Sequence, residues 1–288
     1  MEQPKVSIFA SAVRIPFYKT FLDSLKGTTV PYEVVFAGPN TLPEIEEVIK
    51  KFEIITDEEG EEHNIEVNKI DLKYQDFHWA IGDNSIFNYI HTNNIKPAQC
   101  YEVARRACIG ETILWAADDC EFSPDLIGKV YRDWKALNDE KAIMSIQTLE
   151  NGMFVNMKVH SFFGGQTNTP LMAPLGLMSR KVMDDLGGFD RRYICGQYEN
   201  DAVMRVIAAG GKVHIWGDRE NLITIDHYRR HGIHRPFAMG YNHDREILEK
   251  SWTNGAGKVM PEIQIPFEPY EAEGITVRSQ SFNKSIWD

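Results

Sequence analysis

The sequence predicts a layered α/β domain. Strand-like segments alternate with helix-like segments along most of the 288 residues, which favours helices packed on a sheet. An apolar fraction of 43% with 11% aromatic residues is enough for one large core. One strand-like segment, residues 113–117, runs directly into Asp118, Asp119 and Glu121. The sequence therefore also predicts a functional site at the end of a strand.

Local signals place the elements of the first half. Pro16 suits the first turn of a helix and Gly27 follows its end. Thr41 and Glu44 have the spacing of a capping box. The regular rhythm is lost across 52–85, where an acidic run predicts an inserted hairpin. The expected elements are strands at 5–10, 32–37 and 86–90 and helices at 16–25, from 43 onward and at 97–108.

Glycine pairs mark the helix ends of the second half. Gly187-Gly188 follows one predicted helix, and Gly210-Gly211 follows another that begins at Tyr198. Residues 161–174 contain glycines and prolines and predict a long active-site loop. The expected elements are strands at 113–117 and 142–146 and helices at 124–137, 179–186 and 198–209.

Charge and composition exclude several classes of protein. A net charge of -11 argues against a surface built for general nucleic-acid binding, although the basic segment 227–235 leaves local phosphate contacts open. No segment approaches the about 18 apolar residues of a membrane span, and the N-terminus lacks the features of a signal peptide. We therefore expect a soluble, cytoplasmic protein without a membrane span. The cysteines are expected to be reduced thiols, not zinc ligands: Cys100, Cys108, Cys120 and Cys195.

The acids after residue 117 allow two interpretations. Carboxylates crowded at the end of a buried strand repel one another, and a divalent cation between them and an anionic ligand relieves that repulsion. This interpretation predicts a metal site for a nucleotide diphosphate. The alternative is a simple loop start, with residues 123–125 capping the next helix.

Three motifs follow the acids in a fixed order: Gly187-Gly188-Phe189-Asp190, Glu199-Asn200-Asp201 at a helix start, and Arg205. In this order the chain resembles the GT-A nucleotide-sugar glycosyltransferases of family-two type, from about Val6 to His227. Residues 248–252 are similar to the Lys-Trp ending of such domains. The resemblance implies a Rossmann-like GT-A fold with a mixed central sheet flanked by helices. It also implies a catalytic domain at 1–226 and an extension at 227–288 that completes the active site within the same domain.

The resemblance implies a site for Mn²⁺ or Mg²⁺. Asp119 matches the acid expected to contact the metal directly, and Asp118 would act through the ribose or a metal-bound water. The first acid of the family motif would fall on Ala117, so the chain departs from the pattern there. Glu121 is a weaker candidate beside the metal. His227 matches a downstream histidine that completes the metal or diphosphate site in related enzymes.

The resemblance also implies a catalytic base and a donor pocket. Alignment on Arg205 places Glu199 at the position of the base, with Asp201 as the alternate; both acids would also suit a helix N-terminus for structural reasons alone. The ends of the first two strands are the expected nucleoside pocket, and two arginines beyond His227 are expected to pair with phosphate oxygens. The nominated donor-binding residues are Ser11, Ala12, Val13, Arg14, Gly38, Asp118, Arg229 and Arg230.

The implied activity is transfer of a sugar from a nucleoside diphosphate, expected to be UDP, to an acceptor hydroxyl with inversion. The enzyme would be a hexosyl- or pentosyltransferase, and its acceptor a glycan or a hydroxymethylated or already glycosylated nucleic-acid base. The aromatic rings of Phe162, Phe163, Tyr193 and Trp216 suit either sugar stacking or the core. Two alternatives stay open: a nucleotidyltransferase, for which the glycine-rich phosphate loop is missing, and a non-catalytic nucleotide-sugar-binding module.

Overall fold

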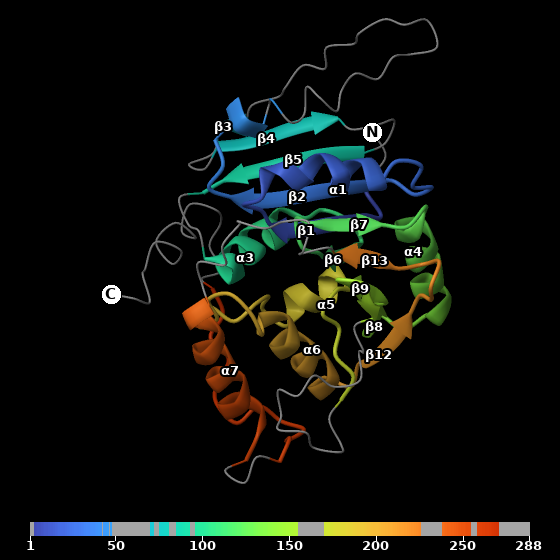
Figure 1. The fold of residues 1–288 in the computed structure, drawn as a ribbon. Coiled ribbons are helices and arrows are strands. Elements are labelled where there is room, and N and C mark those ends of the chain that lie inside the picture. The colour runs from blue at the N-terminus through green and yellow to red at the C-terminus, as the bar shows by residue number, and fades with distance from the viewer. Residues whose placement is uncertain are drawn as a thin grey trace, which may run out of the picture.

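A nine-stranded mixed sheet forms the centre of the part of the chain that the structure describes (Figure 1). The structure is a computed structural model, and it describes residues 3–41, 43–45, 47, 70–71, 75–80, 85–92, 96–154, 170–225, 238–254 and 258–270. In spatial order the strands are β12 (Lys212–Trp216), β8 (Ala142–Ile146), β11 (Gly176–Ser179), β6 (Thr112–Trp115), β1 (Val6–Ser11), β2 (Tyr32–Gly38), β5 (Ser85–His91), β4 (Gln75–Ala80) and β3 (Ile70–Asp71).

The sheet is parallel in its middle and antiparallel at defined places. Strands β6, β1, β2 and β5 run parallel to one another, whereas β11 runs antiparallel to both β6 and β8. The carboxyl ends of β1, β2 and β6 consequently meet at one edge, where open α/β sheets bind ligands. The predicted mixed central sheet is confirmed.

Helices cover both faces of this sheet. The ring of Phe36 on β2 meets Tyr18 of α1, and the ring of Phe9 on β1 meets Tyr101 of α3. Phe9 is in register with Val35, so Phe36 points to the opposite face, and α1 and α3 cover different sides. The helical elements are η1 (Ile15–Phe17), α1 (Tyr18–Ser24), α3 (Pro97–Ala107), α4 (Leu126–Leu137), α5 (Arg180–Asp185), α6 (Tyr198–Ala208) and α7 (Ala238–Trp252).

A second, smaller sheet starts directly after the acids, and the sequence pattern does not reveal it. Its strands, in spatial order, are β10 (Met153–Phe154), β9 (Thr148–Glu150), β13 (Ile223–Ile225) and β7 (Cys120–Phe122). They are two or three residues long, too short for an alternating pattern to show. Strand β7 pairs with β13, which ends just before residue 226.

The local signals of the first half act as expected. The backbone N–H of Thr41 donates to the Glu44 carboxylate at 2.7 Å, as a capping box requires. Pro16 lies in the short helix η1, and Gly27 adopts a φ of +80° beyond the end of α1. Most of the predicted hairpin at 52–85 and most of the predicted loop at 161–174 lie outside the described residues.

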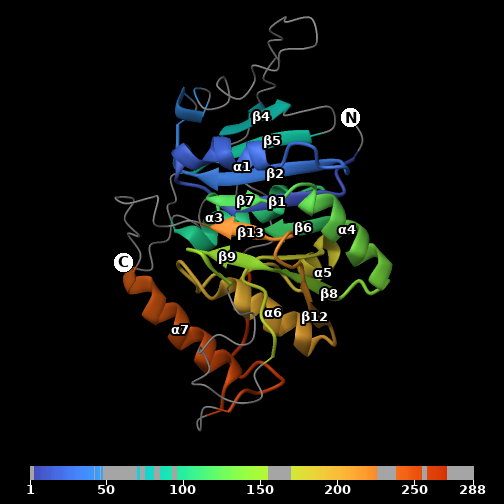
Figure 2. The ribbon, with the colours of Figure 1, turned by 45° about the vertical axis from the view of Figure 1, so that its right-hand side comes forward.

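Helix α7 packs against α6 at one end of the molecule (Figures 1 and 2). Trp252 at the end of α7 is fully buried, and Asp190 forms a β-bridge with Pro269. In the described segments, none of the helices combines the length and apolar character needed to cross a bilayer. The four cysteines are thiols outside any disulfide, as the sequence predicts.

Candidate active site

The acid pair lies on a tight turn at the end of β6. The N–H of Cys120 donates to the Ala117 carbonyl at 3.0 Å, and the N–H of Ala117 donates to the Cys120 sulfur at 3.3 Å. Asp118 and Asp119 sit between these contacts and are almost entirely buried. Glu121 follows on β7 with an exposed side chain. The turn therefore fixes the pair at the carboxyl edge and directs Glu121 to solvent.

Asp118 ties this turn to the loop after β1. Its Oδ2 accepts the backbone N–H groups of Val13 and Arg14, each at 2.8 Å, and its Oδ1 accepts from Arg14 Nε at 2.7 Å. These contacts cross more than 100 positions of sequence, |i−j| being 105 for Val13. Burial raises the pKa of Asp118, and the Arg14 charge opposes that shift. Asp118 therefore holds the predicted donor loop in place.

Arg14 lies over both acids. Its guanidinium forms ion pairs with Asp118 and with Asp119 Oδ2. The Arg14 side chain keeps 23% exposure, whereas the Asp119 side chain is fully buried. The partly exposed guanidinium of Arg14 therefore covers the buried carboxylate of Asp119. This places a positive charge at the strand edge where a donor diphosphate is expected.

The ends of β1 and β2, where the nucleoside pocket is predicted, approach each other closely. A Cβ at Gly38 would lie 2.0 Å from the Ala12 carbonyl oxygen, so only glycine permits this approach. The Tyr89 hydroxyl and the Asn40 amide also donate to that oxygen. Ser11 ends β1, and Val13 is 44% exposed. The nominated residues of the first two strands thus gather beside Asp118.

The Gly187-Gly188-Phe189-Asp190 motif forms a structural corner, the glycine corner, in the chain before α6. Gly188 has a φ of +79°, and a Cβ there would lie 2.7 Å from the Glu102 carboxylate and from Arg105. The Phe189 N–H donates to Glu102, and Asp190 pairs with Arg192. The motif therefore joins α3 to the segment that leads into α6.

Asp201 is committed to packing contacts. Its Oδ2 accepts from Arg205 Nε at 2.8 Å and its Oδ1 from Trp252 Nε1 at 2.9 Å, and the residue is fully buried. Arg205 also donates to the carbonyl oxygens of Leu186 and Gly188. Asp201 thus attaches α6 to Trp252 of α7 and holds Arg205, which in turn attaches α6 to the Gly187-Gly188-Phe189-Asp190 motif.

Glu199 differs from Asp201 although it lies two residues away. It occupies the first turn of α6, after Gln197, whose φ is +65°. Its side chain is half-buried, and among the described residues no group donates to its buried Oε2. Burial, followed by the charge of Asp244, raises the pKa of Glu199 to about 7. A carboxyl group in this state can exchange a proton near neutral pH.

Tyr101 connects the two halves of the site, and sequence reasoning did not single it out. Its hydroxyl donates to the Ala116 carbonyl at 2.5 Å, and its ring lies 5.0 Å from that of Tyr198, centroid to centroid. Burial, followed by the charge of Asp118, raises its pKa well above the usual value. Tyr101 thus links the acid turn to the residue before Glu199. An aromatic residue inside an amphipathic helix carries no sequence signal of such a role.

The described carboxylates fit a divalent cation only if a bound ligand supplies further oxygen atoms to the metal. No cluster of three or more His, Cys, Asp or Glu side chains able to hold a metal occurs within the described ranges. Mg²⁺ and Mn²⁺ commonly use one or two protein carboxylates together with substrate phosphates and water. Asp119 suits that role, with the Arg14 guanidinium lying on the same carboxylate. His227, Arg229 and Arg230 lie outside the described residues.

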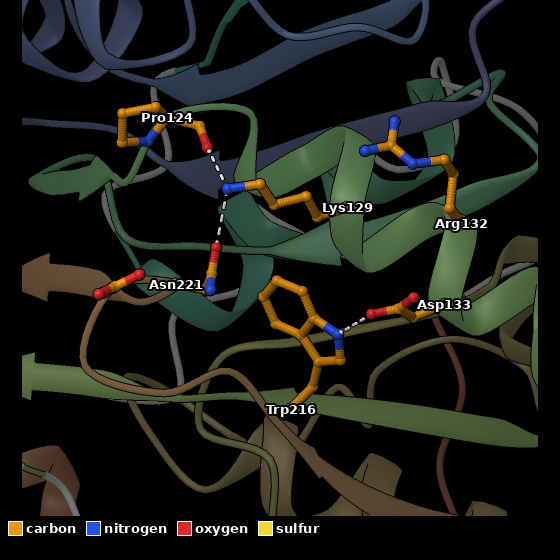
Figure 3. A pocket seen from close by; sticks show the side chains of 7 residues that line it. Pro124, Lys129, Arg132, Asp133, Trp216 and Asn221 are labelled. Carbon is orange, nitrogen blue, oxygen red and sulfur yellow. Dashed lines mark hydrogen bonds between the residues drawn. The ribbon is translucent and has the colours of Figure 1, made fainter.

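The aromatic candidates divide into different environments. Tyr193 is 1% exposed, so its ring belongs to the core. Trp216 lines a pocket of about 490 Å³ beside α4, where its Nε1 donates to Asp133 Oδ2 at 2.7 Å (Figure 3). Lys129 crosses the same pocket and donates to Asn221 Oδ1 at 2.8 Å. Among the described residues, none of the nominated donor or catalytic side chains lines this pocket. Phe162 and Phe163 lie outside the described residues.

Solved structures similar to this chain include those of TarS from S. aureus. TarS 1-349 in complex with UDP aligns with a TM-score of 0.54 at 13% identity, over 77% of this chain and 60% of that chain. TarS 1-349 in complex with UDP-GlcNAc aligns with a TM-score of 0.52 at 12% identity, over 77% and 58%. The fold is the GT-A fold of nucleotide-sugar glycosyltransferases.

The GT-A fold confirms the fold class predicted from the sequence. At these identities the likeness concerns the fold, and the chain spans about 60% of the length of the TarS 1-349 chain. No protein-family model and no curated protein matches the sequence.

Proposed function

We propose that this protein is a metal-dependent glycosyltransferase that moves a sugar from UDP to an acceptor hydroxyl with inversion. One observation carries the proposal. At the carboxyl edge of a GT-A sheet, a fixed acid pair lies under Arg14, and Glu199 with a pKa of about 7 begins α6. Tyr101 contacts the segments that carry both groups. Such a site combines a place for diphosphate with a proton acceptor.

The donor is proposed to bind at the loops after β1 and β2. TarS has been solved with UDP and with UDP-GlcNAc, which makes UDP-GlcNAc the first donor to test here. Arg14 carries the positive charge for the diphosphate, since phosphate oxygens offer guanidinium the same bidentate pairing as carboxylate. Ser11, Ala12, Val13 and Gly38 supply the surrounding backbone, and Arg229 and Arg230 remain predicted phosphate contacts.

The proposed metal is Mn²⁺ or Mg²⁺, held by Asp119 with His227 as a second predicted ligand. When bound, it would neutralise charge on the nucleoside diphosphate leaving group. Asp118 acts differently, because its oxygens accept from the backbone of Val13 and Arg14. Its proposed role is to orient the donor loop.

Glu199 is proposed as the base, in preference to Asp201. An inverting transfer forms a bond from the acceptor oxygen to the anomeric carbon and breaks the bond from that carbon to the phosphate oxygen. UDP leaves with the electron pair of the broken bond, and the hydroxyl proton passes to a Glu199 carboxylate oxygen. Protonation of Asp201 would weaken its charge-assisted contacts to Arg205 and Trp252.

The acceptor is proposed to be a glycan or a modified nucleic-acid base, and the transferred sugar a hexose or pentose. Both acceptors present the hydroxyl that the reaction requires. A nucleic-acid acceptor would rely on the basic segment 227–235, since the chain has a net charge of -11. Parallel assays with hydroxymethylated DNA and with a panel of oligosaccharides distinguish the two acceptor classes.

A donor panel tests the proposal against its alternatives. The protein is incubated with UDP-, GDP- and CMP-sugars plus Mn²⁺, and the released nucleotide is identified. Release of UDP supports a glycosyltransferase, and pyrophosphate exchange supports a nucleotidyltransferase. Tight binding of a UDP-sugar without release, with every acceptor tried, supports a binding module and contradicts the proposed enzyme.

Asp119→Ala tests the metal assignment. We expect loss of Mn²⁺-dependent UDP binding and of transfer, measured by isothermal titration calorimetry and by UDP release. Asp185→Ala is the matched control, because the Asp185 side chain is 61% exposed on α5 and forms a surface ion pair with Lys181. Full transfer and full metal-dependent binding by Asp119→Ala would show the assignment to be wrong.

A further inference from the structure

Asp244 on α7 holds the chain that leads into α6. Its carboxylate accepts three consecutive backbone N–H groups: Ile194 at 2.9 Å, Cys195 at 2.8 Å and Gly196 at 2.9 Å. Asp244 is fully buried and lies 48 to 50 positions further along the sequence. A carboxylate that receives several amide donors is strongly held. The backbone at 194–196 is therefore set by a helix distant in sequence.

This segment leads directly to the proposed base. Gln197 follows it with a φ of +65°, and its side chain accepts from Asn200 Nδ2 at 2.9 Å. Glu199 comes two residues later, in the first turn of α6. On the other side, the Ile194 carbonyl accepts the N–H of Ala98 at the start of α3, at 3.0 Å. A shift of this segment would carry Glu199 with it.

The charge of Asp244 also faces Glu199. Among the described residues, the titratable groups that interact with the Glu199 carboxylate are Asp244 of α7 and the thiol of Cys195. His243 also meets Asp244, with its Nδ1 at 3.0 Å from Asp244 Oδ1. A negative charge beside a carboxylate favours its protonated form. Asp244 thus acts on Glu199 both through the backbone and through the field of its charge.

We propose that Asp244 is a positioning residue for Glu199, because its three amide contacts fix the chain that leads into the first turn of α6. The proposal rests on the proposed function of this site. It assigns α7, which lies in the predicted C-terminal extension, a part in placing the base. The substitution Asp244→Asn removes the charge and keeps part of the anchoring, because the amide oxygen can still accept the N–H groups of Cys195 and Gly196 while the amide nitrogen cannot accept that of Ile194.

The first measurement does not depend on activity. A ¹³C NMR titration of the glutamate carboxyls, with the Glu199 signal assigned by its loss in Glu199→Gln, gives the titration midpoint of Glu199. We expect the midpoint to fall by about half a pH unit or more in Asp244→Asn. Glu246→Gln is the matched control, because it removes a charge from the exposed face of the same helix, and we expect no shift. An unchanged midpoint in Asp244→Asn overturns the effect of charge.

The second measurement uses transfer. We expect Asp244→Ala, which leaves the three amides without an acceptor, to lower kcat at least tenfold while the donor KM changes less than threefold, and Asp244→Asn to restore part of the loss. If Asp244→Ala fails to fold, the Asp244→Asn titration still decides the charge effect. A normal kcat in Asp244→Ala overturns the positioning role. Retained transfer in Glu199→Gln instead contradicts the proposed base, so the two failures are distinguishable.

Discussion

At the scale of single residues, two carboxylates two positions apart have different environments. Asp201 is buried between Arg205 and Trp252, and both of its oxygens are bonded. Glu199 is half-buried, and its Oε2 accepts no hydrogen bond from the described residues. Burial, followed by the charge of Asp244, favours the neutral acid form of Glu199 and raises its pKa to about 7. Glu199 therefore has the proton affinity of a base that works near neutral pH.

Glu199→Gln should abolish most of the transfer. A positioned base contributes roughly 10²- to 10⁴-fold, so we expect a loss of that size in kcat with the UDP Kd changed less than about threefold. Wild-type kcat/KM should rise with pH through about 7, because the base must be deprotonated. Steady-state kinetics between pH 5.5 and 8.5 check both points. A pH-independent rate in the wild type would contradict the role.

Glu199 also links stability to pH. Its pKa is raised above the value in the unfolded chain, so its contribution to stability is fully present below the unfolded pKa and is lost as pH rises through about 7. At pH 8, Glu199→Gln should therefore unfold at a higher temperature than the wild type. The gap should narrow as the pH falls, which thermal melts at several pH values measure. A gap that stays constant across pH would argue against the raised pKa.

Arg14→Met should destabilise the protein and weaken donor binding. The substitution leaves the buried carboxylates of Asp118 and Asp119 without their guanidinium. Breaking a fully buried pair costs about 3 to 5 kcal/mol, and we expect about 2 kcal/mol here because Arg14 remains 23% exposed. Urea unfolding measures the loss. Arg191→Met is the control, since the Arg191–Glu268 pair is exposed on both sides and should contribute less than about 1 kcal/mol.

At the scale of elements, the turns and helix starts place the chemistry. The turn after β6 presents Asp118 and Asp119, and the glycine corner before α6 determines where that helix begins. Strong local rules operate at these points: acids after a strand, glycine at positive φ, and a helix opening with polar residues. These are the features that the sequence predicts correctly. The small sheet beginning at β7 has no comparable local signal.

Gly188→Ala should lower the free energy of unfolding more than Gly210→Ala does. Both glycines have positive φ, +79° and +87°, but a Cβ at Gly188 would lie 2.7 Å from Glu102 and Arg105, whereas a Cβ at Gly210 meets nothing within 4 Å. We expect a loss of about 1 kcal/mol for Gly210→Ala from backbone strain alone. Gly188→Ala should lose about 1 to 3 kcal/mol more through overpacking. Chemical denaturation measures both losses of unfolding free energy. Equal losses would show that Glu102 and Arg105 move away from the new Cβ without destabilising the protein.

At the scale of the whole molecule, the extension beyond residue 226 contributes to the site from a distance. Helix α7 provides Trp252 to Asp201 and Asp244 to the segment at 194–196. The Asp190–Pro269 bridge attaches the last described segment to the glycine corner. The predicted division at residue 226 stays a prediction, but these contacts join both sides of it around α6.

Trp252→Phe tests this connection. Loss of the Nε1 donor leaves Asp201 Oδ1 buried without that bond, which costs about 1 to 3 kcal/mol. Hydrogen–deuterium exchange should increase in α6 and at 194–201. Trp134→Phe is the control, because it removes a similar buried bond, from Trp134 Nε1 to the Ala142 carbonyl, away from α6. Faster exchange at α6 in both variants would indicate general loosening instead.

The sequence by itself determined the alternation of the main strands and helices, the acids at the end of β6 and the glycine corner before α6. These features depend on periodicity and turn chemistry, which act within a few residues. Only the tertiary structure decided two sets of contacts: the ion pair of Arg14 with Asp119, and the hydrogen bonds from the backbone of residues 194–196 to Asp244. They join positions 105 and about 50 residues apart, so they depend on which strand ends meet and where α7 packs. The raised pKa of Glu199 was also decided in space, by burial and by the charge of Asp244.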